Sequence, residues 1–381
     1  MSQNPVYLDY NATAPLRPES AEAIKRAMTV VGNPSSVHRF GRETRKMMEM
    51  AREQVADAIK TDPTHITFVS GATEANNSVL SGSPAKRIFI SAIEHDSLLD
   101  AAYALTPQGY EVHHIPVSHE GVVDLEWLRK KLYEAPETET LISVMMVNNE
   151  TGVIQPIEKV VEIAKGHGQS YVHSDAVQAL GRIPVDFEAL GVDYISLSAH
   201  KIGGPAGIGA LVYDHDTPLQ KYIHGGGQER RRRAGTENFL GAVGFGAAAQ
   251  ACIRDIDRYQ MIGEWRDATE QLMAEAVPEA IFFGRSMKRV PNTIQVSLPA
   301  IPAEKQLMNL DLSGLSVSSG SACSSGSIQP SHVLSAMGVD PKVAEGALRI
   351  SAGWDTMESE MKLFGETWIK MANKLLKGRS T

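Results

Sequence analysis

The chain has 381 residues, of which 43% are hydrophobic and 22% charged, a balance typical of a soluble globular protein with more than one domain. With 37 Lys and Arg against 45 Asp and Glu, the net charge of −8 argues against nucleic acid or an anionic membrane as the main partner. Only two cysteines occur, which excludes a disulfide framework, and we expect neither a secretory leader nor a membrane span. These features predict a folded cytoplasmic protein with a small-molecule ligand.

Apolar residues spaced by three and four predict two amphipathic helices near the start of the chain. The first carries Ala21, Ile24, Met28 and Val31 before a stop at Gly32, and the second carries Met47, Ala51, Val55 and Ala58. Short runs rich in β-forming residues follow, at 65–69, 87–91, 111–117, 141–147, 171–173, 194–198 and 209–213. Because helix-length segments separate several of these runs, we expect a mostly parallel sheet with helices on both faces and a ligand site beyond its carboxyl ends.

The pattern of alternating strands and helices ends near residue 255. A polar, helix-prone stretch is followed by the alternating run NTIQVSL at 292–298, a Ser/Gly-rich loop and a helical C-terminal part. This order predicts a second, smaller α+β domain.

Residues 70–73 (SGAT) follow the first predicted strand and open a helix-prone segment. A small-residue turn at a helix N-terminus directs free N–H groups and the helix dipole at an anion such as phosphate. The alternative is that Thr73 simply caps a helix. The sequence contains no P-loop motif, so a nucleoside triphosphate site is unsupported.

Polar clusters end two successive predicted strands: HSDAVQ at 173–178 and SLSAHK at 196–201. In a parallel sheet both ends meet in one crevice. An aspartate, a lysine and an anion site held together indicate pyridoxal 5'-phosphate, because the lysine can form a Schiff base and the aspartate can keep the pyridine nitrogen protonated. Taken singly, Lys201 could be a solvated surface lysine and Asp175 a strand-end cap.

Six ordered motifs together resemble the cysteine desulfurases of the NifS/IscS type. They are SGATEANN, NNETGV, HSDAVQ, SAHKIGGPAGIGAL, GGGQERRRRAGTEN and SGSACSSG, and the similarity runs from residue 8 to residue 351. The resemblance implies the aspartate aminotransferase-like fold, fold type I of pyridoxal phosphate enzymes, in the α/β class. It also implies a large cofactor-binding domain at 15–255 and a small domain made of 1–14 and 256–381, which carries the catalytic cysteine loop.

The same resemblance implies a role for each site residue. Lys201 would be the Schiff-base lysine, Asp175 would pair with the pyridine nitrogen, and His95 would stack on the ring and exchange protons. Asn149 and Gln178 would contact the phenolic oxygen. The phosphate would lie against Ala72, Thr73, Ser198 and His200, with Thr236 added across a homodimer. Arg349 would hold the substrate carboxylate through a charge-assisted fork, helped by Asn33.

The two cysteines have opposite surroundings. Cys323 lies in a Ser/Gly-rich run that is too small and polar to pack a core, so we expect an exposed thiol on a mobile loop, as a sulfur carrier needs. Cys252 follows AAAQA on a predicted helix, so we expect it to be a buried residue that only fills space in the core. The arginines at 230–233 predict a solvated or interface segment, and no histidine pattern predicts a metal site.

The function implied is conversion of L-cysteine to L-alanine, with the sulfur left on Cys323 as a persulfide for an iron–sulfur scaffold or another acceptor protein. Two alternatives stay open. One is a selenocysteine lyase or another pyridoxal-phosphate lyase. The other is an inactive binding partner in a sulfur-transfer assembly, although Lys201, Asp175 and Cys323 are all present.

Overall fold

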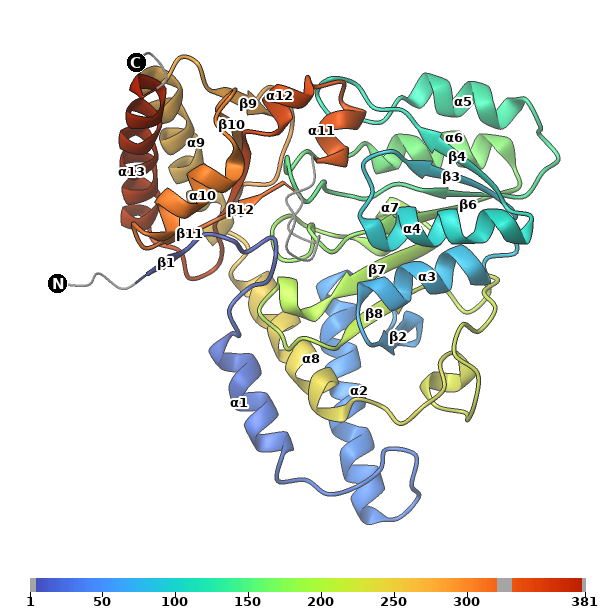
Figure 1. The fold of residues 1–381 in the computed structure, drawn as a ribbon. Coiled ribbons are helices and arrows are strands. Elements are labelled where there is room, and N and C mark those ends of the chain that lie inside the picture. Colours follow the sequence, from blue (N-terminus) through green and yellow to red (C-terminus); the bar gives the residue numbers. More distant parts are fainter. Residues whose placement is uncertain (1–4, 321–330, 379–381) are drawn as a thin grey trace.

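A computed structural model describes residues 5–320 and 331–378, and its centre is a seven-stranded sheet with helices on both faces (Figure 1). The strand order is β2-β8-β7-β6-β5-β3-β4, and only β8 runs against the others. This confirms the predicted α/β fold with its mostly parallel sheet. The strands are β2 (Ile66–Val69), β3 (Arg87–Ser91), β4 (Glu111–Ile115), β5 (Thr140–Ser143), β6 (Ser170–Asp175), β7 (Tyr194–Ser198) and β8 (Gly209–Val212).

The inner strands are apolar because both of their faces are covered. In β3, Ile88 and Ile90 face one hydrophobic cluster and Phe89 faces another, as the alternation of side chains in a strand requires. The first cluster includes α3 (Ala72–Gly82) and α4 (Asp96–Leu105). The second includes α2 (Arg39–Ala58), α5 (Leu125–Tyr133), α6 (Ile157–His167) and α7 (Phe187–Leu190).

Three helices form the lower part of the molecule in Figure 1: α1 (Pro18–Ala27), α2 and α8 (Phe239–Arg254). The small residues along α8 let it pack closely against α1 and α2. Both early helices were predicted, but the first is shorter than its apolar pattern. It ends at Ala27, and Met28 and Val31 are 68% and 76% exposed, because the chain turns away before they can face the core.

A second, four-stranded antiparallel sheet has the order β12-β13-β10-β9. Its strands are β9 (Ile281–Phe283), β10 (Thr293–Ser297), β12 (Ser318–Ser319) and β13 (Ala347–Ser351), so the alternating run at 292–298 is β10. This sheet packs with α9 (Arg258–Ala276), α10 (Ala303–Asp311) and α13 (Glu358–Lys377) around Trp368 and Phe364. Two short helices, α11 (His332–Ala336) and α12 (Pro341–Ala344), lie between β12 and β13 in the chain.

The first described strand belongs with this second core. β1 (Val6–Tyr7) pairs in parallel with β11 (Leu315–Ser316), and Val6 and Leu8 are buried in the same cluster as Trp368. Residues about 300 positions apart therefore share one core.

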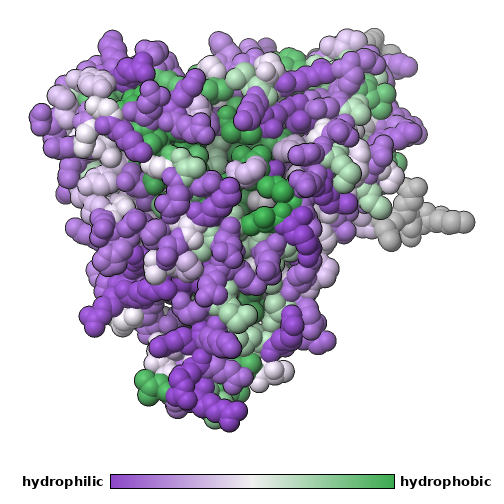
Figure 2. Space-filling view, turned by 180° about the vertical axis from the view of Figure 1, so that it is seen from behind, coloured by the Kyte–Doolittle hydropathy of each residue, from purple (hydrophilic) through white to green (hydrophobic). Residues whose placement is uncertain are grey.

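The outside of the molecule is mostly hydrophilic, as the composition indicates. From behind, hydrophilic residues cover most of the surface, with smaller hydrophobic groups between them (Figure 2). Within the described ranges, no helix is both long and apolar enough to cross a bilayer.

The arginine-rich segment is fixed by a buried ion pair. Arg52 on α2 donates to both carboxylate oxygens of Glu229, at 2.7 and 3.0 Å, and the Glu229 carboxylate also accepts from the backbone N–H of Phe68. Glu229, Arg230 and Arg231 all have positive φ values of 44°, 55° and 68°, a conformation that costs energy in residues with side chains. The ion pair therefore holds a strained turn in place.

We expect Arg52→Met to lower the free energy of unfolding by about 3–5 kcal/mol, because it leaves Glu229 buried without its counter-charge. Urea unfolding of the variant measures this loss. In the double variant Arg52→Met with Glu229→Leu, much of the stability should return. A single variant as stable as the parent protein would show that the pair does not hold this turn.

Candidate active site

The ends of three strands and the start of one helix surround a cavity of about 410 Å³. β6 ends at Asp175, β7 ends at Ser198 and leads into Lys201, and α3 begins just after β2. The cavity is thus at the carboxyl edge of the sheet, where the sequence predicted a site. The predicted site residues that line it are Ala72, Thr73, His95, Asn149, Asp175, Gln178, Ser198, His200 and Lys201.

Asp175 is held by two donors. Its Oδ1 accepts from the backbone N–H of Val177 at 3.0 Å, and its Oδ2 accepts from Asn76 Nδ2 at 2.9 Å. Asn76 also donates to Ser97 Oγ at 2.9 Å. Asn76 belongs to the motif SGATEANN, but no role was predicted for it. Asn76 lies one helical turn after Thr73 on the same face of α3, and this spacing could have indicated that it lies near the cavity.

A second carboxyl group lies within electrostatic range of Asp175. Burial raises the pKa of Glu94 well above its usual value, and the negative charge of Asp175 raises it further. One oxygen of Glu94 accepts from the backbone N–H of Met145 at 2.5 Å.

Lys201 is half-buried, and its Nζ donates to the backbone carbonyls of Asn11 and Ala12, at 2.6 and 2.8 Å. The neighbouring His200 is neutral at neutral pH, because burial and the charge of Lys201 lower its pKa to about 4. The contact with residues 11 and 12 was not predicted. It joins positions 190 apart in the chain.

The N-terminus of α3 has no side-chain cap. Gly71 is the residue before the helix and Thr73 is already inside it, so the alternative in which Thr73 caps the helix is wrong. The turn packs tightly on β8, since a Cβ at Gly209 would lie 2.8 Å from the Cα of Gly71. The free N–H groups of α3 thus remain available to an anion in the cavity.

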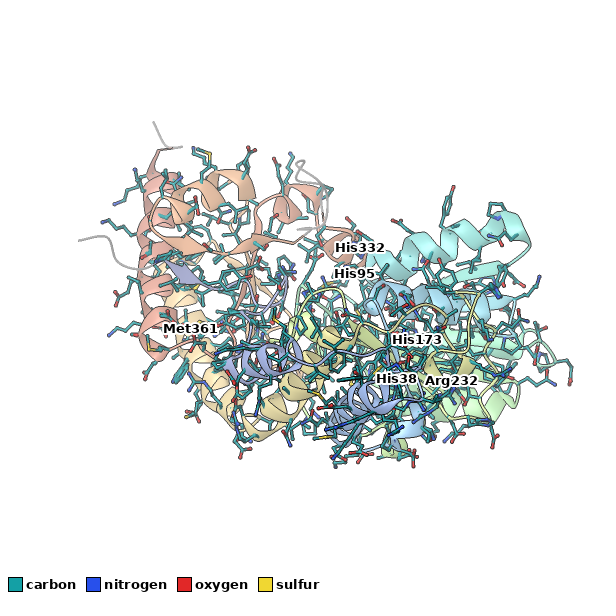
Figure 3. All side chains as sticks on the ribbon, turned by 90° about the horizontal axis from the view of Figure 1, so that it is seen from below. His38, His95, His173, Arg232, His332 and Met361 are labelled. Atoms are coloured by element: carbon teal, nitrogen blue, oxygen red, sulfur yellow. The ribbon has the colours of Figure 1, made fainter. Side chains whose placement is uncertain are left out.

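Asn149, Gln178 and His95 also line the cavity, and they differ in how far their polar atoms are already hydrogen-bonded. Asn149 has a buried Oδ1 atom that has no hydrogen-bond partner among the residues that the structure describes. The Gln178 amide is already engaged, donating to the Asn11 carbonyl at 3.0 Å and accepting from Arg182. His95 lines the cavity while its Nδ1 caps α4 at the backbone N–H of Ser97, and His332 lies close to it (Figure 3).

These features fit pyridoxal 5'-phosphate. The uncapped helix suits a phosphate, the braced carboxylate of Asp175 suits a protonated pyridine nitrogen, and the Lys201 amine suits an aldehyde. The partnerless Asn149 oxygen adds an amide group that is still open to a ligand, since O and N of an amide exchange by a flip.

Three predicted residues do not line this cavity. Arg349 is buried on β13, where its guanidinium donates to Asp9 Oδ1 at 3.0 Å and to the Asn149 carbonyl at 3.3 Å. Thr236 is exposed and lines a neighbouring cavity of about 150 Å³. Asn33 is exposed before α2, and its Oδ1 accepts from the Ser35 N–H. Cys323 lies outside the described residues, so its predicted exposure stays a prediction.

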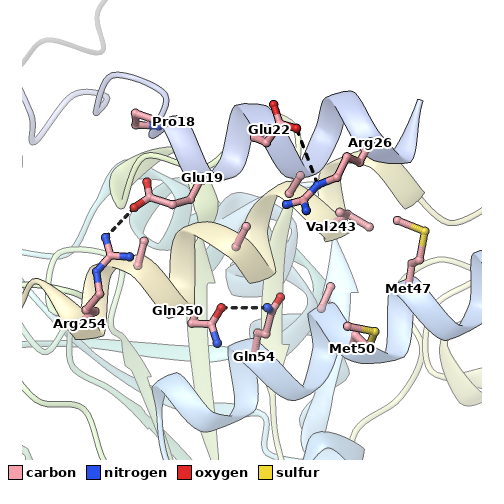
Figure 4. Close-up of a pocket in the computed structure, with 14 residues that line it drawn as sticks. Pro18, Glu19, Glu22, Arg26, Met47, Met50, Gln54, Val243, Gln250 and Arg254 are labelled. Carbon is pink, nitrogen blue, oxygen red and sulfur yellow. Dashed lines mark hydrogen bonds and ion pairs between the residues drawn. The ribbon is translucent and has the colours of Figure 1, made fainter. Parts of the chain in front are cut away.

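A larger cavity of about 1040 Å³ lies between α1, α2 and α8 (Figure 4). Its charged and polar groups pair with one another: Glu19 with Arg254 at 2.5 Å, and Gln54 with Gln250 at 3.2 Å. None of the predicted site residues within 5–320 and 331–378 lines it. The smaller cavity is therefore the candidate active site, because it holds the reactive and anion-binding groups that the larger cavity lacks.

Known proteins share both the sequence and this fold. The family model "Aminotransferase class-V" matches residues 6–364. A cysteine desulfurase IscS of Dictyoglomus turgidum is 42% identical over 97% of this chain and 95% of its own length. A solved structure described as a NifS-like protein superposes with a TM-score of 0.90 at 35% identity, covering 97% of this chain and 99% of its own. Another, described as SspA in complex with cysteine, gives a TM-score of 0.76 at 29% identity, over 91% and 98%.

Proposed function

Since this chain belongs to the class-V aminotransferase family, and within it to the cysteine desulfurases, we propose that it converts L-cysteine to L-alanine and receives the sulfur on Cys323 as a persulfide. It is an enzyme that depends on pyridoxal 5'-phosphate. The observation that carries the proposal is the meeting of Asp175, Lys201 and the uncapped N-terminus of α3 in one cavity.

Each group in the cavity has a task in holding the cofactor. Lys201 would bind it covalently, Asp175 would hold the pyridine nitrogen, and α3 with Thr73, Ser198 and His200 would hold the phosphate. Ala72 contributes backbone to the same turn, Asn149 and Gln178 would face the phenolic oxygen, and His95 would cover the ring. When bound, pyridoxal phosphate withdraws electrons from the α-carbon of an amino acid.

The protein's own groups then complete the reaction. Lys201 Nζ, held by two carbonyl oxygens, is the base that moves the α-proton. The Cys323 thiolate attacks the substrate sulfur, so that an S–S bond forms while the C–S bond breaks and its electron pair stays with the carbon fragment. Protonation of that fragment yields L-alanine. Arg349, with Asn33, would hold the substrate carboxylate. The Arg349 guanidinium would then donate both to Asp9 and to that carboxylate.

The compartment, the oligomeric state and the sulfur acceptor of the enzyme are further parts of the proposed function. We place it in the cytoplasm as a homodimer that passes the persulfide sulfur to an iron–sulfur scaffold or a related acceptor protein. We further divide the chain into a large domain at 15–255 and a small domain of 1–14 and 256–381. The pairing of β1 with β11 and the core shared by Leu8 and Trp368 support that division.

Borohydride reduction of the reconstituted protein tests the cofactor assignment. Peptide mapping should place the pyridoxyl group on Lys201, and the same protein before reduction should release L-alanine from L-cysteine. The Lys201→Arg variant is the control and should carry no label. A label on another lysine, or L-cysteine left unchanged by the holoenzyme, would contradict the proposal.

Thr236 is exposed and does not line the cavity of its own chain. We therefore expect Thr236 of one subunit to complete the active site of the other subunit, so that activity depends on this sharing. Mixing the Lys201→Ala variant with the Thr236→Ala variant should restore part of the activity. In the heterodimer one site then has both an intact lysine and an intact threonine. No recovery after mass spectrometry has shown subunit exchange would contradict sharing.

A further inference from the structure

Glu150 is a buried carboxylate that has no part in the site described above. It follows Asn149 in the turn after β5 and is 1% exposed. Its Oε2 accepts from Ser331 Oγ at 2.5 Å and from Gln295 Nε2 at 3.0 Å. Gln295 lies on β10, so this one oxygen joins the loop beside the cavity to the second sheet.

The same oxygen also packs against Gly320. A Cβ at Gly320 would lie 2.6 Å from Oε2, so any larger residue at this position would displace the Glu150 carboxyl group. Gly320 and Ser331 are the described residues on either side of 321–330, which include Cys323. Glu150 is therefore in contact with both points at which that segment joins the described structure.

The Ser331 side of this contact is itself well anchored. Ser331 Oγ accepts from the Leu334 N–H at 3.1 Å and so caps α11. The next residue, His332, contacts the carbonyl of Glu94 at 2.8 Å, next to the cavity residue His95. A shift of Ser331 away from Glu150 would thus alter the path of the chain beside the cavity.

We propose that Glu150 is a positioning residue for sulfur transfer, because it bonds to Ser331 and packs against Gly320, the two described residues that flank the segment containing Cys323. This inference rests on the proposed function, since Glu150 acts through Cys323. Attack on the substrate sulfur requires a near-contact approach, and a misplacement of about 1 Å can slow such a reaction by about 100-fold. Cofactor binding by Asp175, Lys201 and α3 needs none of these contacts.

The test uses holoenzyme carrying Glu150→Gln, Glu150→Ala or Ser331→Ala. We expect kcat for L-alanine release from L-cysteine to fall by about 10- to 100-fold in Glu150→Ala and less in Glu150→Gln, which keeps the shape of the side chain. KM for L-cysteine and the yield of the pyridoxyl label on Lys201 should stay near the parent values. Ser335→Ala is the matched control, because Ser335 bonds to the Ser331 carbonyl without touching Glu150.

A second measurement separates positioning from general damage. Exchange of the α-hydrogen of L-alanine with deuterated water uses Lys201 but no thiol, so it should continue at the parent rate in all three variants. An equal fall in exchange and in L-alanine release would overturn the proposal, and so would an unchanged kcat in Glu150→Ala and Ser331→Ala. Failure of the parent enzyme in both assays would instead count against the proposed function.

Discussion

Replacing Cys323 with serine should abolish L-alanine formation from L-cysteine while the pyridoxyl label on Lys201 remains. A serine hydroxyl is a far weaker nucleophile than a thiolate near neutral pH, so no group would accept the sulfur. Folding should change little, since the residue lies in a Ser/Gly-rich run. Persulfide labelling of the protein and chromatographic measurement of L-alanine check both parts of this expectation.

Cys252 provides the matched control. It is buried on α8, where burial raises the pKa of its thiol to about 12, so the reactive thiolate is absent at neutral pH. The Cys252 Sγ donates to the Ala249 carbonyl at 3.1 Å, and a serine hydroxyl would have the same partner. Cys252→Ser should therefore keep sulfur transfer and lower the free energy of unfolding by only about 1 kcal/mol. Persulfide on Cys252, or L-alanine release at the parent rate by Cys323→Ser, would show that the wrong thiol was assigned.

The Asp175→Asn variant should lose the negative charge that we propose to hold the pyridine nitrogen of the cofactor. A hydrogen bond to a charged group contributes about 1.5–3 kcal/mol, which corresponds to a fall in kcat of about 10- to 100-fold if it acts mainly in the transition state. Steady-state L-alanine release measures this fall, and the label on Lys201 shows that cofactor still binds.

Asp193→Asn makes the same chemical change outside the cavity. Asp193 precedes β7, and its Oδ2 accepts from the Val172 N–H at 2.7 Å, so the variant should affect stability more than kcat. Equal effects of the two substitutions on kcat would count against a special role for Asp175.

Much of the fold was predictable from local sequence. The central strands are apolar on both faces, so runs such as 87–91 and 194–198 could be assigned without tertiary information. Because parallel strands end at the same edge, the polar clusters after β6 and β7 could also be placed in one crevice. The cavity contains the cofactor residues predicted from those clusters, but their roles stay predictions until the variants are measured.

What the sequence by itself determined was therefore the α/β class, the strands, the family and the cavity residues, since each depends on short-range pattern or on a quoted motif. The tertiary structure alone decided the contacts of Lys201 with Asn11, of Arg349 with Asp9 and of Glu150 with Ser331. These pairs are 190, 340 and 181 positions apart. No periodicity or local propensity encodes such pairs, because they form only after the two sheets and the chain segment near residue 10 have packed together.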